Sequence, residues 1–118
     1  MNLKINSPCR SSFSNFQINH FQIAIIIMIE TIRLIIEGKV QGVFYRQSTR
    51  KKAMELGIKG TVRNLENGDV EIIATGTSQQ LEQLTQWCRQ GPPRASVTKV
   101  CSTPLSLQSF TNFIIIDS

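Results

Sequence analysis

Alternating apolar and polar positions predict a strand in residues 30–37, followed by a loop and a helix. Ile32, Leu34 and Ile36 occupy every second position, which is the spacing of a strand with one face in a core. From residue 44 to residue 56 the spacing becomes helical, and it ends before a glycine that can stop a helix. The stripe of this helix that would face the core consists of Tyr45, Thr49, Ala53 and Leu56.

Two further runs, residues 58–64 and 69–75, alternate in the same way and flank a tight turn. The turn contains Asn67 and Gly68, a pair that tolerates the positive φ angles of short hairpins. The two runs are therefore predicted to be antiparallel neighbours.

A second helix is predicted over residues 78–90. Thr77 can cap it, and Gln80 completes the spacing of a capping box. The apolar stripe is formed by Leu81, Leu84, Trp87 and Cys88, and a Gly-Pro-Pro sequence ends the helix.

Beyond this helix, residues 95–102 and 110–118 are rich in β-branched and aromatic residues, separated by a polar connection containing Pro104. They are expected to form two strands, or one strand and an edge piece. The order β-α-β-β-α-β indicates an α+β fold of the ferredoxin-like type, a sandwich in which two helices cover one face of an antiparallel sheet.

The 118 residues fit one globular domain, preceded by an N-terminal extension of different composition. We assign residues 1–29 to the extension and residues 30–118 to the domain. The extension is basic and serine-containing, has no acidic residue, and ends in an apolar run too short for the roughly 20 residues that span a bilayer. A disordered tail, an organellar presequence and an upstream artefact of a true start at Met28 all remain open.

Charge and residue usage narrow the function classes. The net charge of +5 favours anionic partners, although the basic run at residues 50–52 lies in a helical pattern and fits a solvated face. The three cysteines lack a C-x-x-C spacing, and the single histidine, His20, lies in the extension. Neither a zinc site, nor a histidine-based metal centre, nor a serine or cysteine triad is indicated.

Residues 38–46, GKVQGVFYR, join the first strand to the first helix and have the parts of an anion site. Gly38 and Gly42 allow tight turns and close approach of a ligand, and the helix offers free N–H groups at its start. Arg46 adds a planar, permanently charged guanidinium. The stretch is neither a Walker loop nor G-x-G-x-x-G, so nucleoside triphosphates are not implied. On these residues alone, a plain turn with a surface arginine is an equally good interpretation.

Three segments together, GKVQGVFYR, GTVRNLENGDVE and LTQWCRQGPPRASVTKV, resemble the acylphosphatase family over residues 30–116. The resemblance implies a hydrolase that cleaves the carboxyl–phosphate bond of small acyl phosphates, without cofactor or metal. It also implies that Arg46 binds the substrate phosphate and that Asn64 orients the attacking water. The phosphate would also meet the main-chain amides of the loop Gln41, Gly42, Val43, Phe44, Tyr45 and Arg46.

The residue chemistry fits these roles. A carboxamide such as that of Asn64 can donate to and accept from one water, but it is no strong base. The rate gain would then come from positioning and charge stabilisation during in-line attack, with the substrate's own phosphate as a hypothetical proton acceptor. Without the resemblance, a turn-capping role for Asn64 would be favoured.

Two departures from the family pattern are visible. Thr61 stands where an aromatic residue is usual, and Tyr45 where phenylalanine is common before the arginine. The first is expected to alter packing or substrate affinity rather than chemistry.

The alternative function is a non-catalytic anion- or RNA-binding ferredoxin-like module. The candidate strands carry few aromatic residues for base stacking, so nucleic acid is not expected as a partner. We expect a cytoplasmic monomer that acts on a small-molecule acyl phosphate and has no transmembrane segment.

Overall fold

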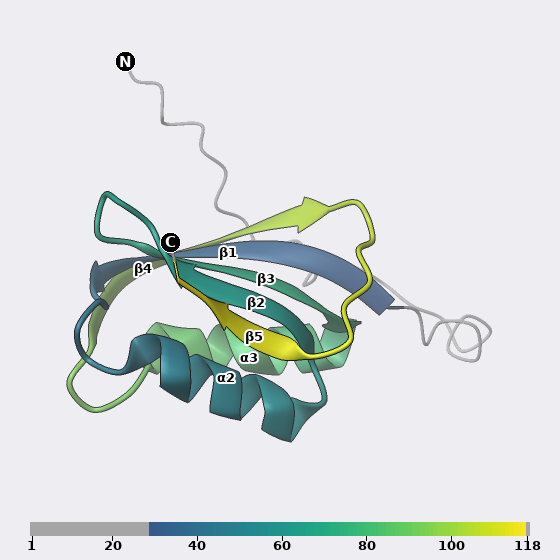
Figure 1. The fold of residues 1–118 in the computed structure, drawn as a ribbon, viewed down its shortest axis with the longest axis horizontal. Helices are drawn as coiled ribbons and strands as arrows, with labels where there is room; N and C mark the ends of the chain where they lie inside the picture. Colours follow the sequence, from purple (N-terminus) through teal and green to yellow (C-terminus); the bar gives the residue numbers. More distant parts are fainter. Residues whose placement is uncertain (1–28, 118) are drawn as a thin grey trace, which may run out of the picture.

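The computed structural model describes residues 29–117, so the predicted extension, apart from Ile29, lies outside the described residues (Figure 1). The elements follow in the order β-α-β-β-α-β-β along the chain. They are β1 (Ile29–Lys39), α2 (Tyr45–Leu56), β2 (Lys59–Asn64), β3 (Val70–Thr77), α3 (Ser78–Gln90), β4 (Ser96–Leu105) and β5 (Phe113–Ile116).

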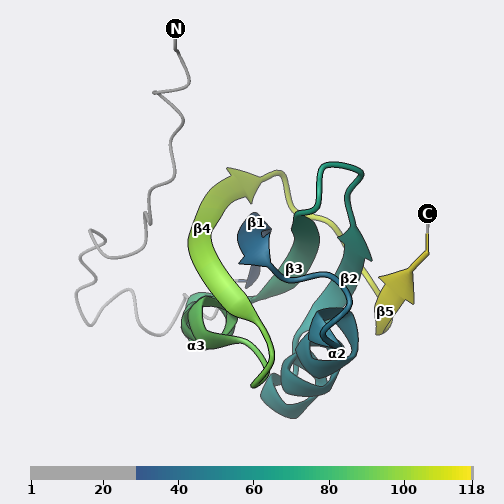
Figure 2. The ribbon, with the colours of Figure 1, turned by 90° about the vertical axis from the view of Figure 1, so that its left-hand side faces the viewer.

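The strands form one sheet in the order β4-β1-β3-β2-β5, and both helices cover the same face of it (Figures 1 and 2). The pairings β4–β1, β1–β3 and β3–β2 are antiparallel. This arrangement confirms the predicted ferredoxin-like α+β sandwich. The sheet differs from the prediction at one edge, where β5 pairs parallel to β2.

The core lies between the helices and one face of the sheet. The alternation in β1 places Ile32, Leu34 and Ile36 there, each at most 1% exposed. The predicted helix stripes face them: Tyr45, Thr49 and Ala53 of α2 are buried, as are three apolar residues of α3, namely Leu81, Leu84 and Cys88. Burying a large apolar side chain contributes about 1.5–3 kcal/mol, so these stripes fix which side of each helix meets the sheet.

The predicted capping box of α3 is present. The Thr77 hydroxyl accepts a hydrogen bond from the Gln80 backbone N–H at 3.2 Å, and the Gln80 side-chain oxygen accepts one from the Thr77 N–H at 2.8 Å. Two N–H groups that helix geometry leaves without partners are thereby satisfied. Thr77 is also the last residue of β3, so the strand passes directly into the helix.

Pro104 does not lie in a connection, as the sequence suggested, but inside β4, opposite Ile32 of β1. The prediction was wrong because β4 is the outermost strand on one side of the sheet that residues 29–117 form, so it pairs with a described strand on one side alone. Proline, which lacks an N–H group, is tolerated on such a strand.

The connection from β4 to β5 is fastened to the sheet face opposite the helices. The carbonyl of Gln108 accepts a hydrogen bond from the Thr75 hydroxyl at 2.9 Å, and the Gln108 N–H donates to the Thr31 hydroxyl at 2.8 Å. This crossing brings the chain from the β4 edge of the sheet to the opposite edge. As a result, β5 and Asp117 lie on the side of the molecule where α2 begins.

Candidate active site

The loop between β1 and α2 contains one glycine with open space at the position of a Cβ and one without. Gly42 has φ 76°, and a Cβ built on it would meet no atom within 4 Å. Gly38 has φ 126°, and its Cβ would collide with the backbone oxygen of Ser96. Gly38 is therefore required by the close approach of β4, whereas the sequence had assigned it to the ligand loop.

The start of α2 has two features that favour a nearby anion. Its N-cap residue, Phe44, makes no side-chain capping hydrogen bond, and the first turn contains no acidic residue. The first N–H groups of a helix carry a partial positive charge. An anion placed before this turn would meet that charge without competition from a capping side chain.

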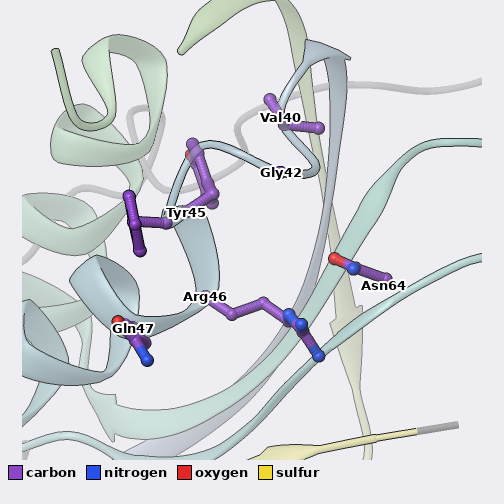
Figure 3. A pocket seen from close by; sticks show the side chains of 7 residues that line it. Val40, Gly42, Tyr45, Arg46, Gln47 and Asn64 are labelled. Carbon is purple, nitrogen blue, oxygen red and sulfur yellow. The ribbon is translucent and has the colours of Figure 1, made fainter. Parts of the chain in front are cut away.

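A pocket of about 290 Å³ lies at this helix start and brings together two residues that are far apart in the sequence. Arg46 comes from the first turn of α2, and Asn64 is the last residue of β2. In Figure 3 the Arg46 side chain extends from α2 toward the end of β2, where Asn64 lies. The complete lining is Val40, Gly42, Phe44, Tyr45, Arg46, Gln47 and Asn64.

The Arg46 guanidinium is partly accessible and has one carboxylate partner within residues 29–117. Its side chain is 32% exposed, and its Nη1 atom lies 3.0 Å from Oδ1 of Asp117. The Asp117 side chain is 87% exposed. A guanidinium has five N–H donors, so this single contact leaves others for a ligand.

The Asn64 carboxamide is not used by the turn that follows it. Its Oδ1 atom is buried and accepts no hydrogen bond from the residues that the structure describes. The side-chain hydrogen bond of the turn comes instead from Asn67, whose Oδ1 accepts from the Asp69 N–H at 3.0 Å. A buried acceptor without a partner among the described residues is unfavourable. The Asn64 oxygen therefore keeps one hydrogen-bonding position that the turn does not use, and the turn-capping interpretation does not fit.

Gln41 links the two parts of the site. Its Nε2 atom donates to the carbonyl oxygens of Leu65 at 2.8 Å and Asp69 at 2.9 Å. Both carbonyls belong to the hairpin that directly follows Asn64. The side chain therefore ties the β1–α2 loop to the β2–β3 hairpin, a role that no local sequence pattern indicated.

The predicted site residues divide into two groups. The pocket lining includes Gly42, Phe44, Tyr45, Arg46 and Asn64 but neither Gln41 nor Val43. Val43 is only 4% exposed and belongs to the core, so any contact of these two with phosphate would run through their amides. Val40 and Gln47 line the pocket without having been predicted, although Gln47 follows Arg46 in the first helical turn.

Tyr45 fastens the helix start to α3. Its hydroxyl donates to the Cys88 carbonyl at 2.7 Å, and its ring centre lies 5.6 Å from that of Trp87. This partner explains why a tyrosine fits at a position where the resemblance led us to expect phenylalanine. Burial raises the pKa of Tyr45 far above its ordinary value and that of the Cys88 thiol to about 12. Both groups stay protonated near neutral pH, so the structure supplies no thiolate nucleophile here.

Residues 29–117 contain neither a candidate metal site nor a candidate membrane-spanning helix. No group of three or more histidine, cysteine, aspartate or glutamate side chains is placed to hold a metal ion. Neither helix in this part of the chain has the length and apolar character needed to cross a membrane.

Comparisons with known proteins agree on one family. The family model described as Acylphosphatase matches residues 32–115. The acylphosphatase of Marinobacter nauticus is 53% identical over 81 residues, covering 68% of this chain and 88% of that protein. The acylphosphatase of Acaryochloris marina is 49% identical over 85 residues, covering 72% and 91%.

Solved structures give the same result. The acylphosphatase structure from Coxiella burnetii superposes with a TM-score of 0.73 at 41% identity, covering 75% of this chain and 93% of that one. The acylphosphatase from Bacillus subtilis gives a TM-score of 0.72 at 32% identity, covering 75% and 99%.

Proposed function

Because the chain belongs to the acylphosphatase family and hydrolyses acyl phosphates, we propose that the Arg46–Asn64 pocket is where this reaction takes place. The observation that carries the proposal is the convergence on one pocket of a guanidinium, an uncapped helix start and a carboxamide oxygen that accepts no hydrogen bond from residues 29–117. The first two attract the phosphate dianion, and the third is suited to a water molecule.

In the proposed reaction, the phosphate lies against the amides of loop 41–46 and the Arg46 guanidinium. The Asn64 side chain accepts a hydrogen bond from the water and directs its oxygen toward phosphorus, opposite the acyl oxygen. The new P–O bond forms as the bond to the acyl oxygen breaks, and the electron pair leaves with the carboxylate. The water's proton passes to a phosphate oxygen, and the products are a carboxylate and inorganic phosphate.

This chemistry needs no strong acid or base. A carboxylate is a stable leaving group at neutral pH, since carboxylic acids have pKa values near 4. The protein's contribution is placement of the water and stabilisation of charge on the phosphoryl oxygens. We propose that no metal takes part.

The test is turnover of benzoyl phosphate by the purified chain in the presence of a chelator. Arg46→Ala and Asn64→Ala are each expected to lower kcat by about a hundredfold or more, which is the usual cost of removing one charge-stabilising or positioning group. Circular dichroism and thermal unfolding establish that each variant is folded.

Two control variants match these changes. Lys51→Ala removes one exposed positive charge from the same helix, and Asn67→Ala removes a carboxamide from the same hairpin. Both are expected to keep most of the activity. A fully active Arg46→Ala would refute the proposed site, and loss of turnover in chelator would refute the metal-free reaction.

We also propose that residues 30–118 act as a cytoplasmic monomer. All residues of the proposed mechanism come from one chain, so catalysis needs no second copy. The substrate is charged and crosses membranes poorly, which favours an enzyme in the compartment where acyl phosphates are made. Light scattering of the purified protein tests the monomer.

A further inference from the structure

Phe44 occupies a backbone conformation that glycine would adopt more easily. Its φ of 64° and ψ of 25° lie in the left-handed region, and it is the single non-glycine residue with positive φ among residues 29–117. For a bulky L-residue this region is unfavourable. Such strained positions concentrate at functional sites, where something other than local stability maintains the residue.

Packing does not explain the phenylalanine either. The residue is 65% exposed, the highest value among the exposed large apolar residues of the described chain. A ring left in water contributes little burial energy. Neither its conformation nor its environment in the folded protein therefore favours a phenylalanine over a glycine.

The position of Phe44 supplies a reason. Phe44 belongs to the lining of the pocket that also contains Arg46 and Asn64. The other apolar side chains of this lining, those of Val40 and Tyr45, are each 1% exposed. Phe44 thus presents the accessible apolar surface of the pocket.

An acyl phosphate has two chemically different ends. Its phosphate requires positive charge and N–H donors, which the helix start and Arg46 provide. Its acyl group cannot use these donors and has to lie outside the proposed phosphate site, toward solvent. An apolar or aromatic acyl group placed there would cover the exposed ring, and aromatic pairs attract one another beyond the area that they bury.

We propose that Phe44 is a specificity-determining residue that binds the acyl group and selects acyl phosphates with aromatic or bulky apolar acyl groups over short ones. The inference rests on the proposed placement of the phosphate at Arg46. It assigns the phenylalanine side chain a role separate from that of the Phe44 amide.

The test compares benzoyl phosphate with acetyl phosphate in Phe44→Gly and Phe44→Asn. Glycine removes the strain, and asparagine tolerates the left-handed conformation with a polar side chain. In both variants the ratio of kcat/KM for benzoyl over acetyl phosphate is expected to fall about fivefold to tenfold. A looser loop would slow both substrates alike, and this effect cancels in the ratio.

The kinetic parameter that changes is also informative. The acyl group keeps its contact with the ring in the ground state and in the transition state, so the fall in the ratio should come through KM and not through kcat. Phe44→Tyr, which keeps a ring, is expected to retain the wild-type ratio. Met54→Ala removes an exposed apolar side chain of α2 that lies outside this pocket, and this variant is also expected to retain the wild-type ratio.

The inference is overturned if the ratio stays at the wild-type value in both Phe44→Gly and Phe44→Asn, or if it falls through kcat. A lower unfolding midpoint of Phe44→Gly in urea would also count against it, because the ring would then serve the fold. An unchanged or higher midpoint supports it. Arg46→Ala separates the two proposals: full activity of that variant refutes the phosphate site itself, whereas an inactive Arg46→Ala with an unchanged ratio at Phe44 refutes the specificity role alone.

Discussion

Among the residues outside the pocket lining, Asp117 contacts the proposed site directly, because its carboxylate lies 3.0 Å from the Arg46 guanidinium. A substrate phosphate would share or replace this contact. The Asp117 side chain is 87% exposed, and ion pairs with so much solvent contribute only about 0–1 kcal/mol. The carboxylate is therefore a weak competitor for the guanidinium.

Asp117→Asn is expected to lower the KM for benzoyl phosphate by less than about fivefold, the factor that corresponds to about 1 kcal/mol. The effect should shrink as salt is raised from about 0.01 M to 0.15 M, because the exposed pair is screened. Steady-state kinetics at both salt concentrations measures it. The control is Glu66→Gln, which neutralises an exposed acidic residue on the hairpin. A change of tenfold or more in kcat for Asp117→Asn would contradict the prediction, because it would mean that Asp117 holds Arg46 in place.

At the scale of the elements, one side chain joins the β1–α2 loop to the β2–β3 hairpin, the two connections beside the pocket. Gln41 donates from the β1–α2 loop to the Leu65 and Asp69 carbonyls in the β2–β3 hairpin. Asn64 lies at the start of that hairpin. The distance between loop 41–46 and the Asn64 carboxamide therefore depends on these two hydrogen bonds.

Gln41→Met keeps the length of the side chain but removes both donors. The kcat is expected to fall by about tenfold to a hundredfold, because a displacement of about 1 Å at a reacting centre can cost this much. The KM should change less, since Arg46 and the helix start remain. Stopped-flow or steady-state kinetics separates the two parameters, and Gln83→Met on the exposed face of α3 is the matched control. A raised KM at wild-type kcat would show that Gln41 acts on substrate binding instead.

At the scale of the whole molecule, two ion pairs that share one carboxylate join three strands on the sheet face opposite the helices. The Glu71 carboxylate of β3 receives the Nε–H of Arg33 on β1 and the Nε–H of Arg63 on β2, each at 2.7 Å. Burial alone would raise the pKa of Glu71, but the hydrogen bonds and charges of Arg63 and Arg33 outweigh it and hold the pKa below its ordinary value. The three central strands are thus joined by side chains as well as by their backbones.

The pKa direction fixes the sign of a stability change. In the folded protein the pKa of Glu71 lies below its ordinary value of 4.5. The ionised carboxylate therefore stabilises the fold at pH values above 4.5, and this stabilisation is lost as the pH falls through the lower pKa of the folded state. Glu71→Gln is expected to lower the free energy of unfolding by about 1–2 kcal/mol at pH 7, from weakened charge-assisted hydrogen bonds. The difference from wild type should close toward pH 3.

Urea unfolding at a series of pH values measures this difference. Glu82→Gln, an exposed acid on α3, should show no such pH dependence. An equal difference at pH 3 and pH 7 would rule out the ionised triad as its source.

The sequence predicted those features of the structure that are determined by residues close together along the chain. The stripe of α2 and the capping of α3 by Thr77 follow from spacing within a few residues, and both are present. Arg46 was singled out at the junction of a strand and a helix, whereas the role of Asn64 came from the resemblance of three segments to a family; both residues line one pocket. In contrast, Gly38 was misassigned because its partner, the Ser96 backbone, is far along the chain, and the two acceptors of Gln41 depend on how the hairpin folds back.

The same limit applies at the edges of the sheet. The position of Pro104 inside a strand and the parallel pairing of β5 depend on which strands end up outermost. No pattern within those segments specifies a neighbour. A single sequence therefore predicts the centre of this fold better than its borders.

The contact between Tyr45 and Trp87 has a practical consequence. Trp87 is the one tryptophan in the chain, and its ring packs 5.6 Å from that of Tyr45 in the first turn of α2. Its emission spectrum should therefore respond when an anion settles against that turn, so that inorganic phosphate could be titrated by intrinsic fluorescence with no dye or label attached.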